Sequence, residues 1–122
     1  MNVRAARGAI VVPEDTPEPL HAATAKLLTA LLERNAIAHD DLISILFTVT
    51  DDLRSAFPAE AARRMGMGDI PLLCAREIPV AGSMPSVVRV LMHFQTERGL
   101  RDITHVYLDG AERLRDDLDA AT

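Results

Sequence analysis

The feature that most constrains the fold is the alternation of side chains from Ser86 to Thr96. On one parity it reads Val88, Val90, Met92 and Phe94, and on the other Val87, Arg89, Leu91 and His93. A repeat of two residues is that of a β-strand, whose successive side chains point to opposite faces of a sheet. We therefore predict a strand here, with Arg89 projecting from one face of a rigid element.

Another strand is predicted near the start of the sequence. The segment Val3–Val12 is rich in small and β-branched residues and ends at Pro13. Arg4 and Arg7 differ in parity, so they should face opposite sides of the sheet unless Gly8 introduces a bulge. Only one of the two arginines then needs a functional role.

A long amphipathic helix should follow this strand. Thr16, Pro17 and Glu18 supply a capping hydroxyl, a proline at the first helical position and an acid in the first turn. Apolar residues then recur at helical spacing, at Leu20, Ala23, Leu27, Leu28 and Leu31. Such a helix would cover a sheet, and the polar residues 33–35 mark its C-terminal end.

The remaining elements define the fold class. They are a strand at Leu42–Val49 suited to burial on both faces, a short helix at Phe57–Met65 ended by Gly66, a strand at Ile70–Ile78 near an edge or interface, and a last strand at Thr104–Leu108. A helix between the first two strands favours their parallel pairing, and a turn-linked later pair favours antiparallel pairing. The prediction is an α+β fold, with a mixed β-sheet packed against one long amphipathic helix and one short helix.

Length and composition set outer limits on what the chain does. Its 122 residues fit a single domain, residues 1–122, and so small a domain would bury more surface by self-association. A net charge of −5 argues against nucleic-acid binding. No apolar run approaches the roughly 18 residues that span a membrane, and a single cysteine fits a reducing compartment. We expect a cytoplasmic protein.

The usual signatures of catalytic and metal sites are missing. Gly66-Met67-Gly68 lacks the third glycine of a dinucleotide site, and the sequence has no phosphate loop, HExxH or GxSxG motif. The four histidines, His21, His39, His93 and His105, are scattered. His93 and His105 are best interpreted as half-buried strand residues with local hydrogen bonds. We expect neither a metal nor a cofactor.

What remains is a set of side chains suited to a small dianion. Twelve of the 13 basic residues are arginines, which grip carboxylates with a planar fork, although biased codon usage explains most of that number. Position singles out five residues: Arg7, Arg63, Arg89, Glu77 and Tyr107. Such a set binds and stabilises charge without forming a covalent intermediate, so any catalysis would be by positioning and electrostatics.

A series of short motifs gives this set a family context. In order they are 4–9 (Arg-Ala-Ala-Arg-Gly-Ala), 57–59 (Phe-Pro-Ala) with Arg63, 71–77 (Pro-Leu-Leu-Cys-Ala-Arg-Glu), 89–92 (Arg-Val-Leu-Met), and 105–108 (His-Val-Tyr-Leu) with Leu114 and Arg115. Their order and spacing resemble those of the AroH-class chorismate mutases. The resemblance covers about residues 2–118 and leaves 119–122 as a tail.

The resemblance implies a reaction and an assembly. The reaction is the [3,3] rearrangement of chorismate to prephenate in phenylalanine and tyrosine biosynthesis, and it needs no cofactor. The family forms homotrimers, in a pseudo-α/β-barrel arrangement, with a site at each subunit interface. Two other interpretations stay open from the residues alone: a trimeric small-carboxylate enzyme of the enamine/imine deaminase kind, and a non-catalytic sensor of an aromatic-pathway metabolite.

The resemblance also implies roles for individual residues. Arg89 would donate to the ether oxygen and a carboxylate, Arg7 and Tyr107 would hold the side-chain carboxylate, and Glu77 would accept the ring hydroxyl. Further residues would line or close the site: Leu73, Cys74, Ala75, Arg76, Phe57, Ala59, Arg63, Leu114 and Arg115.

Two points depart from the expected pattern. Cys74 and Glu77 have opposite parity, so we predict a bend or bulge between them if both are to meet the substrate. Glu60 stands where the family often has a lysine near the mouth of the site, and the segment 64–71 is shortened. Without that lysine the mouth of the site has one positive charge fewer to attract an anion, and Arg63 and Arg64 could compensate for it.

Overall fold

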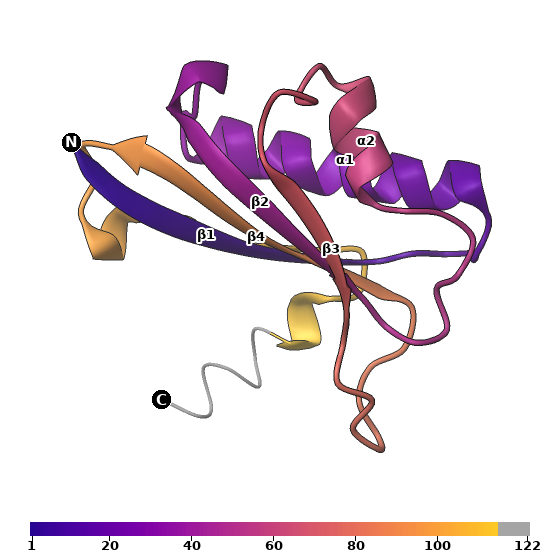
Figure 1. The fold of residues 1–122 in the computed structure, drawn as a ribbon. Helices are drawn as coiled ribbons and strands as arrows, with labels where there is room; N and C mark the ends of the chain where they lie inside the picture. Colours follow the sequence, from indigo (N-terminus) through magenta and orange to yellow (C-terminus); the bar gives the residue numbers. More distant parts are fainter. Residues whose placement is uncertain (115–122) are drawn as a thin grey trace.

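The computed structural model describes residues 1–114 and contains one five-stranded sheet with two helices (Figure 1). The strands are β1 (Asn2–Val11), β2 (Leu42–Val49), β3 (Leu72–Arg76), β4 (Val87–Thr96) and β5 (Val106–Leu108). The helices are α1 (Pro17–Arg34) and α2 (Ala59–Arg64), with short 3-10 turns at His39–Asp41 and Leu100–Asp102. The predicted α+β class and mixed sheet are confirmed.

The sheet has the strand order β3-β2-β4-β1-β5. β4 is central and antiparallel to both β1 and β2, whereas β3 runs parallel to β2 and β5 runs parallel to β1. The predicted edge position of the 70–78 strand is thus confirmed, but the two predicted pairings are wrong. β1 does not pair with β2, and β3 does not pair with β4. The reason is that β1 and β4, ten residues each, pair along their whole length and leave the other edge of β4 to β2.

Both helices pack on one face of the sheet (Figure 1). Leu20, Leu27 and Leu31 of α1 are fully buried, as are Phe47 of β2 and Phe94 of β4. These side chains belong to one continuous core cluster. The helix begins at Pro17 as predicted, although Thr16 makes no side-chain capping hydrogen bond. The apolar stripe of α1 and the even-numbered face of β4 therefore form the main core.

Gly8 allows α1 to approach β1 closely. A Cβ atom at this position would lie 2.9 Å from Leu27 Cδ1, 3.0 Å from Leu31 Cδ1 and 3.2 Å from the carbonyl oxygen of Val106. The pairing of β1 with β4 continues through residue 8 without a shift, so Gly8 does not make a bulge. Arg4 and Arg7 accordingly face opposite sides of the sheet, as their parity predicted.

Replacing Gly8 by alanine should lower the free energy of unfolding by about 1–3 kcal/mol, because overfilling a packed core forces neighbours to shift. Gly68→Ala is the matched control, because its new Cβ would meet nothing nearer than Arg63 Cγ at 4.0 Å. Its effect should stay within about 0.5 kcal/mol. Urea unfolding of the two variants measures the difference, and equal stabilities would contradict this account of Gly8.

The opposite face of the sheet has no long helix over it within residues 1–114. Register pairs place one set of side chains on this open face: Arg7, Ala9, Leu46, Thr48, Leu73, Ala75, Arg89, Leu91 and Tyr107. The segment 111–114 packs onto one end of it, where Ala111 and Leu114 meet Ala9 and Val87 together with Met84 of the loop before β4. β2 is consequently buried on its helix side and only half-buried on the other, rather than buried on both faces as predicted.

Candidate active site

A cavity of about 320 Å³ lies on the open face of the sheet. Four of the predicted site residues line it: Arg7 from β1, Glu77 just after β3, Arg89 from β4 and Tyr107 from β5. The strand registers explain why they meet. Ala9 pairs with both Arg89 and Tyr107, so these side chains project on the same side from neighbouring strands.

Arg89 and Glu77 form an ion pair inside this cavity. Arg89 Nε lies 2.9 Å from Glu77 Oε1, and the two side chains are 41% and 26% exposed. Nε is buried and its N–H is not directed at that oxygen, so within residues 1–114 the contact is an ion pair rather than a formed hydrogen bond. The pair spans β2, because β2 lies between β3 and β4. Arg89 is thus held near a carboxylate while keeping donors free for a ligand.

Arg7 adds a second guanidinium to the cavity. Its backbone N–H donates to Nδ1 of His105 over 3.0 Å, which ties the centre of β1 to the segment before β5. No carboxylate lies within ion-pair distance of the Arg7 side chain in the described part of the chain. With two guanidinium groups against one carboxylate, the cavity has a positive balance suited to a dianion.

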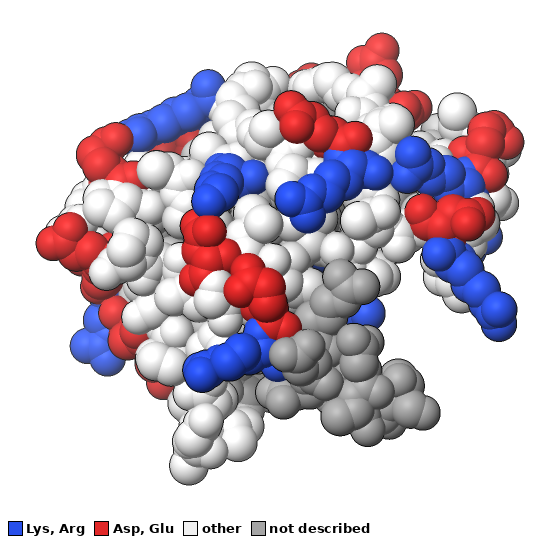
Figure 2. Space-filling model, turned by 180° about the vertical axis from the view of Figure 1, so that it is seen from behind, with Lys and Arg blue, Asp and Glu red and all other residues white. Residues whose placement is uncertain are grey.

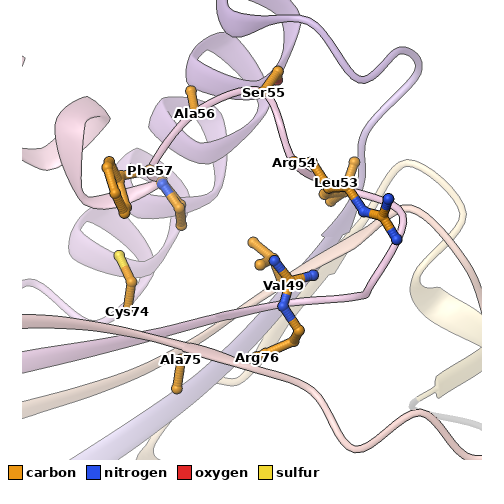
Figure 3. Close-up of a pocket in the computed structure, with 10 residues that line it drawn as sticks. Val49, Leu53, Arg54, Ser55, Ala56, Phe57, Cys74, Ala75 and Arg76 are labelled. Atoms are coloured by element: carbon orange, nitrogen blue, oxygen red, sulfur yellow. The ribbon is translucent and has the colours of Figure 1, made fainter.

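A second cavity, of about 350 Å³, opens on the helix side of β3 (Figure 3). Its lining includes Phe57, Cys74, Ala75 and Arg76, together with Leu53, Arg54 and other residues of the segment before α2. Figure 3 shows the Cys74 sulfur directed towards Phe57, whereas Ala75 points to the other side of the strand. Phe57 is 72% exposed, which is unusual for so large an apolar side chain.

The bulge predicted between Cys74 and Glu77 is absent. β3 pairs with β2 without a register shift, and the N–H of Glu77 continues the ladder by donating to Val49 O over 2.9 Å. Glu77 therefore lies on the same face as Ala75, and the side chain of Cys74 lies on the opposite face. No bulge is needed to bring Glu77 to Arg89, because regular alternation along β3 already turns Glu77 to the open face, where Arg89 lies.

Hydrogen bonds hold the segment that carries Phe57. The carboxylate of Asp15 accepts the backbone N–H groups of Arg54 and Ser55, each at 3.0 Å. Arg76 Nη1 donates to Asp51 O over 3.2 Å, which links the end of β3 to the same segment. An exposed phenylalanine is thus presented on a fixed backbone.

A further carboxylate fixes the chain where it enters β4. Asp52 accepts the N–H of Ser86 at 3.2 Å and its hydroxyl at 2.8 Å, and Ser86 has a φ of +60°. Burial acts to raise the pKa of Asp52, but hydrogen bonds from Thr50 and Ser86 outweigh it and lower the pKa below its ordinary value. This contact sets the start of the strand that presents Arg89.

The other predicted site residues lie outside the first cavity. Leu73 is on the open face and 60% exposed, and Ala59 is buried at the start of α2. Arg63 is on α2 and pairs with Glu60 at 3.3 Å, while Leu114 packs near Val87. Arg115 lies outside the described residues. The structure therefore gathers Arg7, Glu77, Arg89 and Tyr107, and separates them from the group around Phe57.

Glu60 changes the charge around α2. It pairs with Arg63 at 3.3 Å and with Arg64 at 3.9 Å, and Arg64 also approaches Glu18 at 3.4 Å. On the face seen in Figure 2, basic and acidic side chains lie next to one another in the same way. The two arginines that could replace the missing lysine are thus partly engaged by acids, in exposed pairs of small energetic weight.

Sequence reasoning missed six residues of the first cavity: Gly8, Ala9, Leu46, Thr48, Val90 and Leu91. Three of them, Leu46, Thr48 and Leu91, present their side chains on the open face from β2 and β4. The alternation in β2 and β4 already placed each of them on a face of its strand. The missing information was that β2 and β4 are neighbours, since this brings Leu46 beside Leu91 and Thr48 beside Arg89. His93 and His105 do have the predicted local partners, Ser44 Oγ at 3.3 Å and the N–H of Arg7.

Comparisons with known proteins show the family of this chain. The family model described as "Chorismate mutase type I" matches residues 3–118. The chain is 55% identical to chorismate mutase AroH from Thermus thermophilus over 120 residues, covering 98% of each protein. It is 37% identical to chorismate mutase AroH from Bacillus subtilis (strain 168) over 119 residues, covering 97% of this chain and 94% of that one. The solved chorismate mutase of Clostridium thermocellum superposes with a TM-score of 0.88 at 49% identity, over 89% of this chain and 97% of its own.

The fold and the matched relatives together define the class of protein, a small α+β enzyme. The chain belongs to the type I chorismate mutase family. It is a chorismate mutase, which converts chorismate to prephenate in aromatic biosynthesis. This excludes the deaminase-like enzyme and the non-catalytic sensor.

None of the helices within residues 1–114 is long and apolar enough to cross a membrane. Within the same residues, no three His, Cys, Asp or Glu side chains are grouped so that they could hold a metal ion.

Proposed function

We propose that the open-face cavity is the active site of this mutase, and that a second copy of the chain completes it in a homotrimer. The observation that carries the proposal is the Arg89–Glu77 pair, 2.9 Å apart, in one cavity with Arg7 and Tyr107. One cavity then holds both signs of charge needed by a polarised rearrangement. The chain acts as a single domain, residues 1–122, in the cytoplasm.

Arg89 stabilises the transition state. As chorismate rearranges, the ether carbon–oxygen bond lengthens and negative charge develops on the oxygen. A guanidinium fixed on a central strand donates to that oxygen without reorganising, and such preorganised donors have large effects on rate. The position of Arg89 on β4, paired on both sides, supports this role.

The other cavity residues restrain the substrate. Arg7 and Tyr107 hold the side-chain carboxylate and keep the enolpyruvyl arm folded over the ring, in a near-attack conformation. Glu77 accepts the ring hydroxyl and faces the positive end of the transition state. Its place beside Arg89 supports this, since the ether oxygen and the ring hydroxyl of chorismate are on adjacent ring carbons and need neighbouring partners.

A second copy is needed because the predicted site residues lie on opposite faces of one sheet. Arg7, Arg89 and Tyr107 project from the open face, whereas Phe57 and Arg63 belong to the helix side. One chain cannot wrap both groups around one small molecule. In the assembly, residues of α2, of the segment before it and of β3 in one copy close the cavity of the next: Phe57, Ala59, Arg63, Leu73, Cys74, Ala75 and Arg76. Leu114 and Arg115 are expected to contribute from the C-terminal segment.

Exposed apolar groups support this assembly. Phe57 and Leu73 are 72% and 60% exposed in the single chain, and β3 forms an open sheet edge. Association of small domains buries such groups. The positive balance of the cavity also favours a dianion over a neutral ligand.

Sedimentation equilibrium with a parallel chorismate assay tests the proposal. The expected mass is three times 13.3 kDa, about 40 kDa, with closed three-fold symmetry. The assay follows loss of chorismate absorbance in the same samples on dilution, and activity should fall as the trimer dissociates. A fully active monomer would rule out an interface site while leaving the family membership intact.

A further inference from the structure

The hydroxyl of Thr48 lies in the wall of the active-site cavity without a partner. Thr48 is in β2, and its neighbours on the two flanking strands are Arg89 and Ala75. Its Oγ1 atom is buried and makes no hydrogen bond within residues 1–114. Burying a hydroxyl without a hydrogen-bond partner costs free energy. We therefore expect this hydroxyl to gain a partner when a ligand is bound.

Thr48 lies under the Arg89–Glu77 ion pair. In the strand order β3-β2-β4, a contact between the residue after β3 and a residue of β4 must cross β2 (Figure 1). The crossing is at Thr48, because Thr48 is the register partner of Arg89. Directly paired residues of neighbouring strands have Cβ atoms about 4.5–5.5 Å apart, which is within reach of a hydroxyl and a guanidinium.

A polar atom of the register partner of Thr48 is also unsatisfied. Arg89 Nε is buried, lies 2.9 Å from Glu77 Oε1, and has no formed hydrogen bond within the described chain. A threonine hydroxyl accepts and donates at once. It can accept the Nε–H of Arg89 while donating its own hydrogen to the carboxylate of Glu77. The remaining N–H groups of the guanidinium then point to the ligand.

We propose that Thr48 is a positioning residue, which orients Arg89 and Glu77 when chorismate is bound. The proposal rests on the roles given above to these two residues. When substrate binds, the guanidinium donates to the ether oxygen and the carboxylate accepts the ring hydroxyl, so contacts with the ligand replace their direct contact with each other. Thr48 bridges them in that state and keeps the guanidinium plane aligned with the breaking bond.

Three substitutions separate the hydroxyl from the shape of the side chain. Thr48→Val keeps the β-branched shape but removes the hydroxyl, and Thr48→Ser keeps the hydroxyl. We expect kcat to fall about tenfold or more in Thr48→Val with KM changed less than about threefold, because small losses of alignment cost turnover rather than binding. Thr48→Ser should stay within about twofold of wild type. Thr48→Ala also removes the hydroxyl and replaces Thr48→Val if the valine variant does not fold.

A spectroscopic measurement distinguishes orientation from a general structural effect. In the complex with prephenate, the Nε–H proton of Arg89, assigned by its absence in Arg89→Lys, should exchange slowly with water in wild-type and Thr48→Ser protein. It should exchange rapidly in Thr48→Val. A normal kcat in Thr48→Val, or an equal loss in Thr48→Ser, would overturn the proposal.

The outcome for Arg89 itself separates this inference from the proposed site. If Arg89→Ala loses turnover and Thr48→Val does not, Thr48 has no positioning role and the site stands. If Arg89→Ala keeps turnover, the assigned roles in the cavity are wrong, and the inference about Thr48 falls with them.

Discussion

Arg89→Ala is expected to lower kcat by roughly 10²- to 10³-fold, equivalent to about 3–4 kcal/mol, with the fold intact. The reason is that the rearrangement breaks a C–O bond and forms a C–C bond within the substrate, without a covalent intermediate on the enzyme, so its rate depends on stabilising the charge of the transition state. Arg89 is half-exposed in the cavity and is not part of the helix-side core, so its loss leaves the main packing unchanged. Steady-state kinetics with chorismate, together with circular dichroism and thermal unfolding, measure the effect.

Two further arginine variants sharpen this result. Arg89→Lys keeps the positive charge but loses the planar fork, so most of the loss in kcat should remain. Arg101→Ala removes an arginine from the exposed 3-10 turn Leu100–Asp102 and should leave kcat within about twofold. Near-normal turnover in Arg89→Ala would show that another group stabilises the ether oxygen.

Two impaired variants, Arg89→Ala and Arg63→Ala, are expected to recover activity when they are assembled into mixed trimers. Arg89→Ala removes the open-face donor, and Arg63→Ala removes a cation from α2 on the helix side. Loss of a charge-assisted hydrogen bond from Arg63 should cost about 1.5–3 kcal/mol, or roughly 10- to 150-fold in kcat/KM. If each site takes Arg89 from one copy and Arg63 from the next, a mixed trimer contains some sites with both arginines intact.

The amount of recovered activity is a quantitative test. Unfolding and refolding equal amounts of the two variants together should give about one quarter of the wild-type sites, because each of the two required subunits is chosen with even chance in a closed ring. The double variant Arg63→Ala with Arg89→Ala, refolded with itself, is the control and should stay inactive. Recovery no greater than the sum of the separately refolded variants would place both arginines in one chain.

The elements of the fold were largely predictable from the sequence, because local signals determine them. Pro17 and the stripe of leucines specify α1, and the alternation around Arg89 specifies β4. The strand pairings were not predictable in the same way. Which edges of β4 receive β1 and β2 depends on contacts between residues far apart in sequence, and alternation says nothing about neighbours.

The same distinction applies to the candidate site. Arg89 stood out because a charge interrupts an apolar alternation, and Arg7, Glu77 and Tyr107 gained their roles from the spacing of the family motifs. Thr48 gave no signal, since threonine is an ordinary strand residue. The bulge expected before Glu77 came from assigning Cys74 to the same cavity. The strand instead keeps its parity and turns Cys74 to the helix side.

The position of β1 between β4 and β5 has a consequence for the order in which the protein is made. β1 leaves the ribosome first, but its two partners begin at Val87 and Val106. At roughly 5–20 residues per second, the 76 residues from Val11 to Val87 take about 4–15 seconds to synthesise.

During that interval β1 lacks both of its partner strands, so its unpaired backbone groups are open to pairing with other chains. Because Tyr107 comes from β5, the proposed substrate cavity is complete only after β5 has been made. A nascent chain that stops before β5 is therefore expected to be inactive and prone to aggregation.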